Sequence, residues 1–276
     1  MIPTPVPRDR PLVLFTDMDG TLLDHHTYDV RGSAAAVRAL RRRRATLVFC
    51  SSKTFAEQIY WQRRLRLCQP FIFENGSALA LPGGFFPEAL YSARHREAGY
   101  DIVVFAHADA GALCSLLAGM SGAKGYSGAS DAELSSATGL KGAALARARA
   151  RWYTETLLAP SDPEQAGVLG RLLEPHGFSL SQGGRFYTAQ AAHVSKGQAV
   201  RWMLGMFGHT TALPPYSAAV GDSLHDASML EVVDLPFLVQ GPDRRWAALS
   251  VSQLRRIHHV GPAGFSEVVR LLLGEE

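Results

Sequence analysis

The chain has 276 residues, 47% of them hydrophobic, a composition that can bury the core of one large domain or of two modest ones. Its 28 basic and 25 acidic residues leave a formal net charge of only +3, which is too small to indicate a nucleic-acid or membrane-surface partner. No apolar run approaches the roughly 18 residues of a membrane span, so a soluble globular protein is expected.

The N-terminal residues 1–10 are rich in proline and contain no apolar stretch of signal-peptide length. We therefore expect a flexible tail there and a cytoplasmic location. Three cysteines, Cys50, Cys68 and Cys114, are widely spaced and form no CxxC pair. They predict free thiols in a reducing compartment and no structural zinc.

The first predicted element after the tail is a short strand that ends at two carboxylates. Residues 12–15 are four consecutive apolar residues, as in a strand buried on both faces of a parallel sheet, and Asp17, Asp19 and Gly20 follow at once. Chemistry in α/β folds is found at the carboxyl ends of such strands. An Asp-Gly turn after a strand is by itself more often only a turn, so the other segments decide the interpretation.

The segment up to residue 83 indicates a doubly wound α/β layer. A helix followed by a continuous apolar run forms half of a βαβ unit, and such units build a parallel sheet. The predicted elements are a helix at 31–44, strands at 45–50, 71–73 and 78–81, and a helix starting at Thr54, where Glu57 has capping-box spacing.

The pattern changes after Pro82–Gly84, and residues 84–190 are typical of an α+β module inserted into the core domain. The predicted strands are at 100–106, 152–158, 178–181 and 185–189, and the last two form a hairpin around Gln182–Gly184. Helices are predicted at 110–120, at 143–151 and from Asp162 to about His176. Another short helix is predicted to start at Ser130, with Glu133 as its capping partner.

The α/β pattern returns in residues 191–276. The predicted elements are a helix from Ser195 to about Phe207, a strand at 217–220 that ends at Gly221–Asp226, a helix at 227–233, a strand at 235–239 and a closing helix at 264–273. The predicted fold class is therefore α/β, with a Rossmann-like doubly wound parallel-sheet core (residues 1–83 and 191–276) and an inserted α+β cap domain (residues 84–190) that determines substrate specificity.

Three predicted strand ends and one helix start carry polar side chains that can meet at one edge of the sheet. These residues are Asp17 and Asp19, Ser51 and Ser52, Asp222 and Asp226, and Lys196. Mg²⁺ prefers hard oxygen ligands and keeps several waters, so Asp17, the backbone carbonyl of Asp19, and Asp222 would be sufficient protein ligands. Asp226 would bind the ion directly or support its ligands.

The DxD spacing also suits phosphoryl transfer. One carboxylate can attack phosphorus and form an aspartyl phosphate, while its neighbour protonates the leaving alkoxide and later activates water. We assign the first role to Asp17, which the metal would keep ionised, and the second to Asp19, which can carry a proton. The spacing allows this because residues two apart on an extended strand point the same way. Ser51 and Lys196 would hold the phosphoryl oxygens.

The ordered motifs DMDGT (17–21) and GDSLHD (221–226), with Ser51 and Lys196 between them, resemble those of the haloacid dehalogenase-like phosphohydrolases over essentially the whole chain. His225 departs from the pattern of that superfamily, which usually has Asn there. The resemblance implies a nucleophile, Asp17; a general acid/base, Asp19; phosphate-binding residues, Met18, Ser51, Ser52 and Lys196; and metal-binding acids, Asp17, Asp19, Asp222 and Asp226, for Mg²⁺.

Further segments resemble the mannosyl-3-phosphoglycerate phosphatase family in order: SSKT (51–54), ENG (74–76), YTETL (153–157), GGRFY (183–187) and GPAGF (261–265). This resemblance implies a small phosphorylated glycoside as substrate, above all mannosyl-3-phosphoglycerate, with mannosylglycerate as product. Such a molecule carries a carboxylate and hydroxyls beside its phosphate, so its predicted contacts are Lys53, Asn75, Glu155 and Arg185.

Several alternatives stay open at this point. Lys53, Glu155 and Arg185 can equally be solvated surface residues, because charged side chains mostly are. The same chemistry can act on glucosyl-3-phosphoglycerate, sucrose phosphate, another sugar phosphate or phosphoglycolate. A non-catalytic sugar-phosphate sensor is disfavoured because it would not need both Asp17 and Asp19. We expect a monomer or a homodimer.

Overall fold

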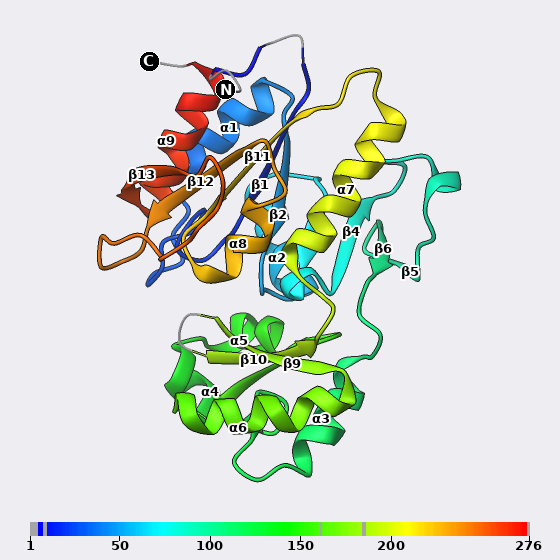
Figure 1. The fold of residues 1–276 in the computed structure, drawn as a ribbon, viewed down its shortest axis with the longest axis vertical. Coiled ribbons are helices and arrows are strands. Elements are labelled where there is room, and N and C mark those ends of the chain that lie inside the picture. Colours follow the sequence, from blue (N-terminus) through cyan, green and yellow to red (C-terminus); the bar gives the residue numbers. More distant parts are fainter. Residues whose placement is uncertain (1–4, 8–9, 161, 184–185, 275–276) are drawn as a thin grey trace.

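The structure is a computed structural model that describes residues 5–7, 10–160, 162–183 and 186–274. Its elements form two layers (Figure 1). The larger, which we call the core layer, holds a nine-stranded sheet with helices on both faces. The smaller, the cap layer, lies within residues 110–191 and holds a four-stranded sheet with helices.

The core sheet has the strand order β13-β12-β11-β1-β2-β3-β4-β6-β5. Its strands from β13 to β3 run parallel, and β4, β6 and β5 continue the sheet in antiparallel pairs. The bounds are β1 (Leu12–Thr16), β2 (Thr46–Cys50), β3 (Phe71–Phe73), β4 (Ala78–Pro82), β5 (His95–Glu97), β6 (Tyr100–Val104), β11 (Tyr216–Gly221), β12 (Leu235–Gln240) and β13 (Arg255–Val260).

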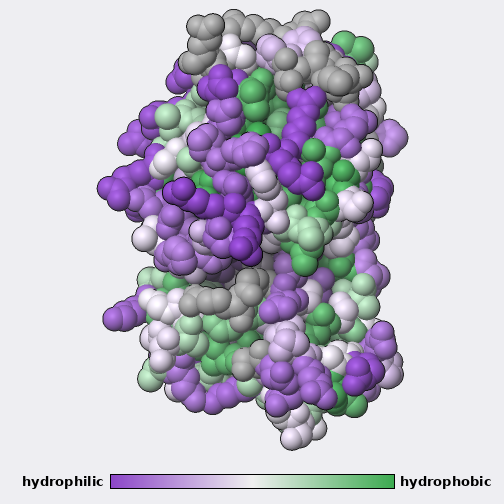
Figure 2. All heavy atoms as spheres, turned by 60° about the vertical axis from the view of Figure 1, so that its left-hand side comes forward, coloured by the Kyte–Doolittle hydropathy of each residue, from purple (hydrophilic) through white to green (hydrophobic). Residues whose placement is uncertain are grey.

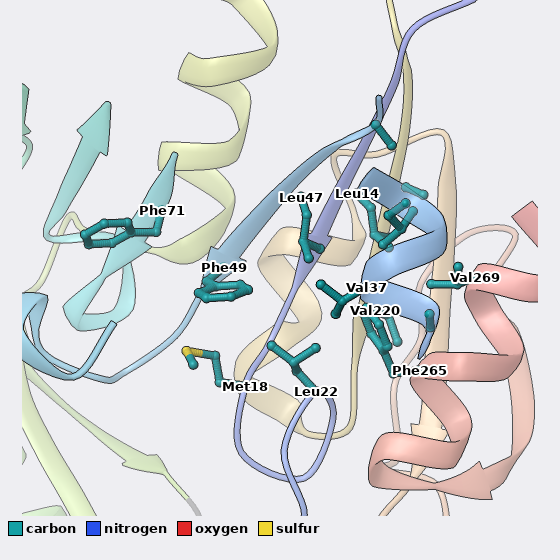
Figure 3. Close-up of a cluster of buried hydrophobic side chains, with 14 of the residues drawn as sticks. Leu14, Met18, Leu22, Val37, Leu47, Phe49, Phe71, Val220, Phe265 and Val269 are labelled. Atoms are coloured by element: carbon teal, nitrogen blue, oxygen red, sulfur yellow. The ribbon is translucent and has the colours of Figure 1, made fainter. Parts of the chain in front are cut away.

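Helices cover both faces of this sheet, as the alternation of strands and helices predicts. One face carries α1 (Ala34–Arg42), α2 (Phe55–Arg64) and α9 (Gly261–Leu273), and the other carries α7 (Lys196–Thr210) and α8 (Ala227–Leu230). Figure 3 shows the first of these cores, where Leu14 and Leu47 of the sheet face Val37 of α1 and Phe265 of α9. Burial on both faces explains why the parallel strands are continuous apolar runs.

Two helix starts next to the sheet edge are fixed by the predicted caps. The Thr54 hydroxyl accepts from the Glu57 backbone N–H, and the Glu57 side chain accepts from the Thr54 backbone N–H, so the capping box at α2 is confirmed. At α7 the Ser195 hydroxyl accepts from the Gln198 backbone N–H at 3.1 Å. These caps place the residues just before α2, and Lys196 in the first turn of α7, at the edge.

The cap layer has the strand order β7-β8-β10-β9. Its core includes Leu113, Leu157 and Leu173. The predicted hairpin of β9 with β10 and the capping pair Ser130 and Glu133 are confirmed. The bounds are α3 (Ala110–Ala118), β7 (Lys124–Gly125), α4 (Asp131–Thr138), α5 (Gly142–Arg149), β8 (Glu155–Ala159), α6 (Pro163–Leu173), β9 (Phe178–Gly183) and β10 (Phe186–Ala191). In the two layers together, 3₁₀ turns lie at η1 (Glu74–Gly76), η2 (Glu88–Leu90), η3 (Glu174–His176) and η4 (Leu224–Asp226).

The predicted start of the inserted module at residue 84 is wrong. The strand predicted at 100–106 is β6, which pairs with β4 of the core sheet, and residues 95–97 form a further strand, β5, that pairs with β6. The chain crosses to the cap layer only between β6 and α3, and it returns between β10 and α7 (Figure 1). Pro82–Gly84 marks only a turn at the end of β4, and the chain then continues to β5 and β6 of the same sheet. Turn residues of this kind look the same at a domain boundary.

Other differences have local causes. Strand β8 begins at Glu155 and not at Trp152, because the backbone N–H groups of residues 152–154 bond a side chain of the core layer. Strand β13 is absent from the prediction because only Ile257 in it is buried, so it forms no apolar run. Helix α8 ends at Leu230, three residues before its predicted end.

The surface in Figure 2 is largely hydrophilic, with small hydrophobic areas between charged groups. Among the described residues no helix is both long and apolar enough to cross a membrane. The three cysteines are free thiols: Cys50 is buried beneath the sheet edge, Cys68 is exposed, and Cys114 lies in the cap layer.

Candidate active site

The strand register brings the predicted polar groups to one edge of the core sheet. Thr16 at the end of β1 pairs with Phe49 of β2 on one side and with Val220 of β11 on the other. The segments 17–20, 51–53 and 221–226 therefore leave three adjacent strands at the same level. This confirms that the candidate groups share one edge.

Lys196 is the centre of a buried charge cluster at this edge. Its Nζ lies 2.7 Å from Asp17 Oδ1 and 2.8 Å from Asp226 Oδ1. Asp17, Asp222 and Asp226 offer carboxylate oxygens that all lie within 4.8 Å of one another. Three carboxylates thus surround one lysine, and the cluster carries excess negative charge.

Burial and crowding perturb the pKa values of Asp17, Asp222 and Lys196. Burial raises the pKa of Asp17 from 3.8 to about 7, against the lowering influence of Lys196. Burial, together with repulsion from Asp17 and Asp226, also raises the pKa of Asp222 well above its ordinary range. Burial alone would lower the pKa of Lys196, but the carboxylates of Asp17 and Asp226 outweigh it and raise that pKa well above normal.

Two glycines let the acids approach one another. Gly20 has φ +82°, and a Cβ there would lie 2.6 Å from Asp222 Oδ2. A Cβ at Gly221 would collide with the Asp226 carboxylate. Asp226 accepts from the backbone N–H groups of Asp222 and Ser223 through Oδ2, and from Lys196 through Oδ1. Both its oxygens are engaged, so Asp226 holds the other groups in place.

The donor set fits a divalent cation such as Mg²⁺. Asp17 and Asp222 keep free acceptor capacity toward the cavity, and a cation would offset the excess negative charge. The carboxylate of Asp19 lies outside this group, so its predicted contact through the backbone carbonyl stays a prediction.

Asp19 is held by a second lysine. Lys53 Nζ lies 2.9 Å from Asp19 Oδ2 and 3.6 Å from Glu57 Oε1, and it sits over the ring of Tyr28. Burial would lower the pKa of Lys53, but Asp19 and Glu57 together raise it. Lys53 therefore stays charged beside Asp19 and lines the same cavity, where sequence reasoning placed it as a substrate contact.

The predicted phosphate-binding residues surround the same edge. Ser51 is buried, and its hydroxyl accepts from the Lys53 backbone N–H at 3.3 Å, while Ser52 lines the cavity. The Met18 side chain is fully buried in the core, so Met18 can contact a phosphoryl group only through its backbone. Residues 51–53, which we call the phosphate loop, connect β2 to Thr54, the N-cap residue of α2.

A cavity of about 780 Å³ extends from the aspartates to the cap layer. Asp17, Asp19, Lys196 and Asp222 lie at one end. Its wall also includes Tyr60, Trp61 and Arg64 of α2, Arg147 and Arg151 near the end of α5, Thr156 of β8, Thr188 of β10 and His225. Burial lowers the pKa of His225, so this residue presents a neutral ring. A volume of this size suits a small organic ligand.

Two of the four predicted substrate contacts lie in the cavity wall, one does not, and one is outside the described residues. Lys53 and Asn75 line the cavity, and Asn75 Nδ2 donates to Gln190 Oε1 at 3.0 Å. Glu155 is buried on the opposite face of β8, where Oε1 accepts from the Ser127 backbone N–H. The predicted sugar contact of Glu155 is therefore wrong for this cavity, because alternate strand residues face opposite ways and Thr156 takes the cavity side. Arg185 lies outside the described residues.

Sequence reasoning missed the cations that the cap layer contributes. Arg147 stacks on the Tyr60 ring at 4.1 Å, and Arg151 Nη2 donates to the Ser52 carbonyl at 2.8 Å. Their four-residue spacing at the end of a cap helix was the available signal, but helix ends commonly carry arginines for dipole reasons alone.

The family profile of the haloacid dehalogenase-like hydrolases matches residues 14–83, which contain the first two aspartates and the phosphate loop. Over 269 residues the chain is 30% identical to the glucosyl-3-phosphoglycerate/mannosyl-3-phosphoglycerate phosphatase of Methanococcoides burtonii, and the match covers 95% of this chain and 97% of that one. The chain belongs to the haloacid dehalogenase-like phosphohydrolases. The predicted resemblance to the mannosyl-3-phosphoglycerate phosphatase family is confirmed, and the protein is a phosphoric monoester hydrolase.

Solved haloacid dehalogenase-like structures share the fold. A hydrolase of this type from B. subtilis superposes with a TM-score of 0.62 at 17% identity, covering 95% of this chain and 99% of that chain. The sucrose-phosphatase of Synechocystis, solved with sucrose and phosphate, gives 0.62 at 15% identity, covering 94% and 97%. Because coverage is nearly complete, the likeness extends to both the core and the cap layers.

Proposed function

We propose that this phosphohydrolase is a Mg²⁺-dependent phosphatase of glycosyl-3-phosphoglycerates, acting on mannosyl-3-phosphoglycerate and on its glucosyl analogue. The observation that carries this proposal is the cavity, which joins an aspartate pair to a cationic wall of Lys53, Arg147 and Arg151. The name of the Methanococcoides burtonii relative supports the choice of substrate.

The cationic wall suits a substrate with a second anionic group. Arg147 is half-buried, it stacks on Tyr60, and no carboxylate pairs with it among the contacts of the described residues. A guanidinium placed in this way can fork onto a carboxylate such as that of glycerate. Thr156 and Thr188 offer hydroxyls from the cap sheet to the sugar.

The reaction proposed for this site has two steps. In the first, the Asp17 carboxylate attacks phosphorus, the bond to the glycerate oxygen breaks, and Asp19 gives that oxygen a proton. In the second, Asp19 takes a proton from water, which attacks phosphorus and releases inorganic phosphate and free Asp17. Lys196, Ser51 and the backbone around Met18 would hold the phosphoryl oxygens. Enclosure by the cap layer would keep bulk water away during the first step.

Asp17 and Asp222 would hold Mg²⁺, which when bound offsets negative charge on the phosphoryl group. We expect chelation to abolish turnover and Mg²⁺ to restore it. Mg²⁺ at about 100 times its Kd should also stabilise the folded protein by about 2.7 kcal/mol. Thermal unfolding at increasing Mg²⁺ concentration measures this shift, and Asp222→Asn should remove most of it. A midpoint that Mg²⁺ leaves unchanged in the wild-type protein would contradict the assignment.

A panel of phosphate esters tests the choice of substrate. We expect kcat/KM for mannosyl- and glucosyl-3-phosphoglycerate to exceed that for sucrose phosphate, phosphoglycolate and p-nitrophenyl phosphate by at least about 100-fold. Sucrose phosphate lacks the carboxylate and phosphoglycolate lacks the sugar, so the panel separates the two parts of recognition. Equal turnover of all five would defeat the specific assignment and leave only a general phosphatase.

A further inference from the structure

Glu74 is a fully buried carboxylate of the core layer whose bonds all go to the cap layer. It follows β3, and its oxygens accept from the backbone N–H groups of Trp152, Tyr153 and Thr154 at 2.8 to 2.9 Å. Oε2 also accepts from the Thr154 hydroxyl at 2.8 Å. Four donors from one cap segment thus converge on one side chain, and burial makes each of these bonds costly to break.

The Thr154 hydroxyl extends this contact to the cavity. It donates to Glu74 and accepts from Arg151 Nε at 2.8 Å. The Nη2 group of Arg151 then donates to the Ser52 carbonyl of the phosphate loop, also at 2.8 Å. A continuous path of hydrogen bonds therefore runs from Glu74 through Thr154 and Arg151 to the phosphate loop.

The two ends of this path, the Glu74 turn and the phosphate loop, both belong to the core layer and are also hydrogen-bonded to each other directly. The Glu74 backbone N–H donates to the Lys53 carbonyl at 3.1 Å, and the Asn75 backbone N–H donates to the Ser51 carbonyl at 3.0 Å. Glu74 has φ +50° and Asn75 has φ +60°, so this turn holds two non-glycine residues in the left-handed region. Backbone strain of this kind persists where the surroundings over-determine it, and here the turn links the phosphate loop to the cap.

We propose that Glu74 and Thr154 are positioning residues that hold Arg151 against the phosphate loop and so fix the cap layer over the reacting phosphate. Arg151 lines the cavity, while Glu74 and Thr154 act through it. The inference rests on the proposed function, because a substrate that fills the cavity depends on the cap and a small phosphate ester does not.

Thr154 offers a matched pair of variants. Thr154→Val keeps the shape and the backbone bond to Glu74 but removes the hydroxyl, whereas Thr154→Ser keeps the hydroxyl. We expect Thr154→Val to raise KM for mannosyl-3-phosphoglycerate at least about tenfold, with kcat for p-nitrophenyl phosphate changed less than about twofold, and Thr154→Ser to restore KM to within about threefold. Equal losses on both substrates, or a wild-type KM in Thr154→Val, would overturn the proposal.

Hydrogen exchange tests the contact between Glu74 and residues 152–154 without any substrate. In Glu74→Gln we expect the backbone amides of residues 152–154 to exchange at least about tenfold faster, with β1 unchanged. Asp101→Asn is the control, since Asp101 is a buried carboxylate of β6 that bonds Tyr91 and Arg96 away from the interface. Unchanged exchange at 152–154, or uniformly faster exchange in the core, would overturn the proposal. If the wild-type protein turns over neither phosphoglycoside, the proposed function fails and the exchange result alone decides the role of Glu74.

Discussion

Asp17→Asn is expected to lower phosphate release by at least about 1,000-fold while the fold persists. An amide cannot replace the carboxylate as the nucleophile that forms the acyl phosphate. The geometry around it should survive, because asparagine has the same shape and Lys196 keeps its bond to Asp226. Steady-state release of phosphate, with circular dichroism as the check on folding, measures this outcome.

The same substitution is expected to stabilise the chelated, metal-free protein at neutral pH. Burial raises the pKa of Asp17 from 3.8 to about 7, so the folded state holds this proton when the unfolded chain has lost it. Wild-type stability should therefore fall as pH rises from about 4 to about 7, and the asparagine variant should escape this loss. A higher thermal midpoint for the variant at pH 8 but an equal one near pH 4 would agree with this account.

Asp101→Asn supplies the control for both measurements, because it also neutralises a buried aspartate but lies on β6 outside the cavity. It should leave phosphate release unchanged. Substantial turnover by Asp17→Asn would remove Asp17 as the nucleophile. A midpoint that falls at pH 8 would show that the bond to Lys196 stabilises the Asp17 carboxylate more than burial and the neighbouring acids disfavour it.

Sequence reasoning found the core of the site because its signals are local. Asp17 and Asp19 follow an apolar run directly, and the capping residues Thr54 and Ser195 fix where two helices begin. In a parallel sheet the direction of each strand also fixes the edge at which its end lies. Local pattern and topology together were therefore sufficient to bring residues 200 positions apart into one cluster.

The cap side could not be predicted in the same way, because its contacts depend on how two layers meet. Glu74 looks like part of an ordinary turn, yet it accepts four hydrogen bonds from residues 78 to 80 positions away. Glu155 was expected in the cavity, but a shift of one residue in the register of a strand reverses which of its side chains face the cavity. Strand register and layer contacts are long-range properties, and a single sequence carries little information about them.

Lys196→Met is expected to lower turnover by at least about 100-fold and also to destabilise the protein, in contrast to Asp17→Asn. Lys196 is only 4% exposed and is bonded to two buried carboxylates, so its removal leaves Asp17 and Asp226 without their cation. Breaking a buried ion pair from one side costs about 3 to 5 kcal/mol. Chemical denaturation of the variant and of the wild-type protein measures this difference.

The pH dependence of the residual activity separates the charge of Lys196 from its packing. The carboxylates of Asp17 and Asp226 overcome burial and keep the pKa of Lys196 well above normal, so the ammonium stays charged at neutral pH. In Lys196→Met the pKa of Asp17 should rise further, because the influence of Lys196 that lowers it is gone. The acidic limb of the pH–rate profile should then move to higher pH, whereas Lys196→Arg, which keeps the charge, should leave the limb in place. A loss of turnover in Lys196→Met without any shift of the acidic limb would mean that Lys196 contributes contacts to the phosphoryl group and does not control the ionisation of the nucleophile.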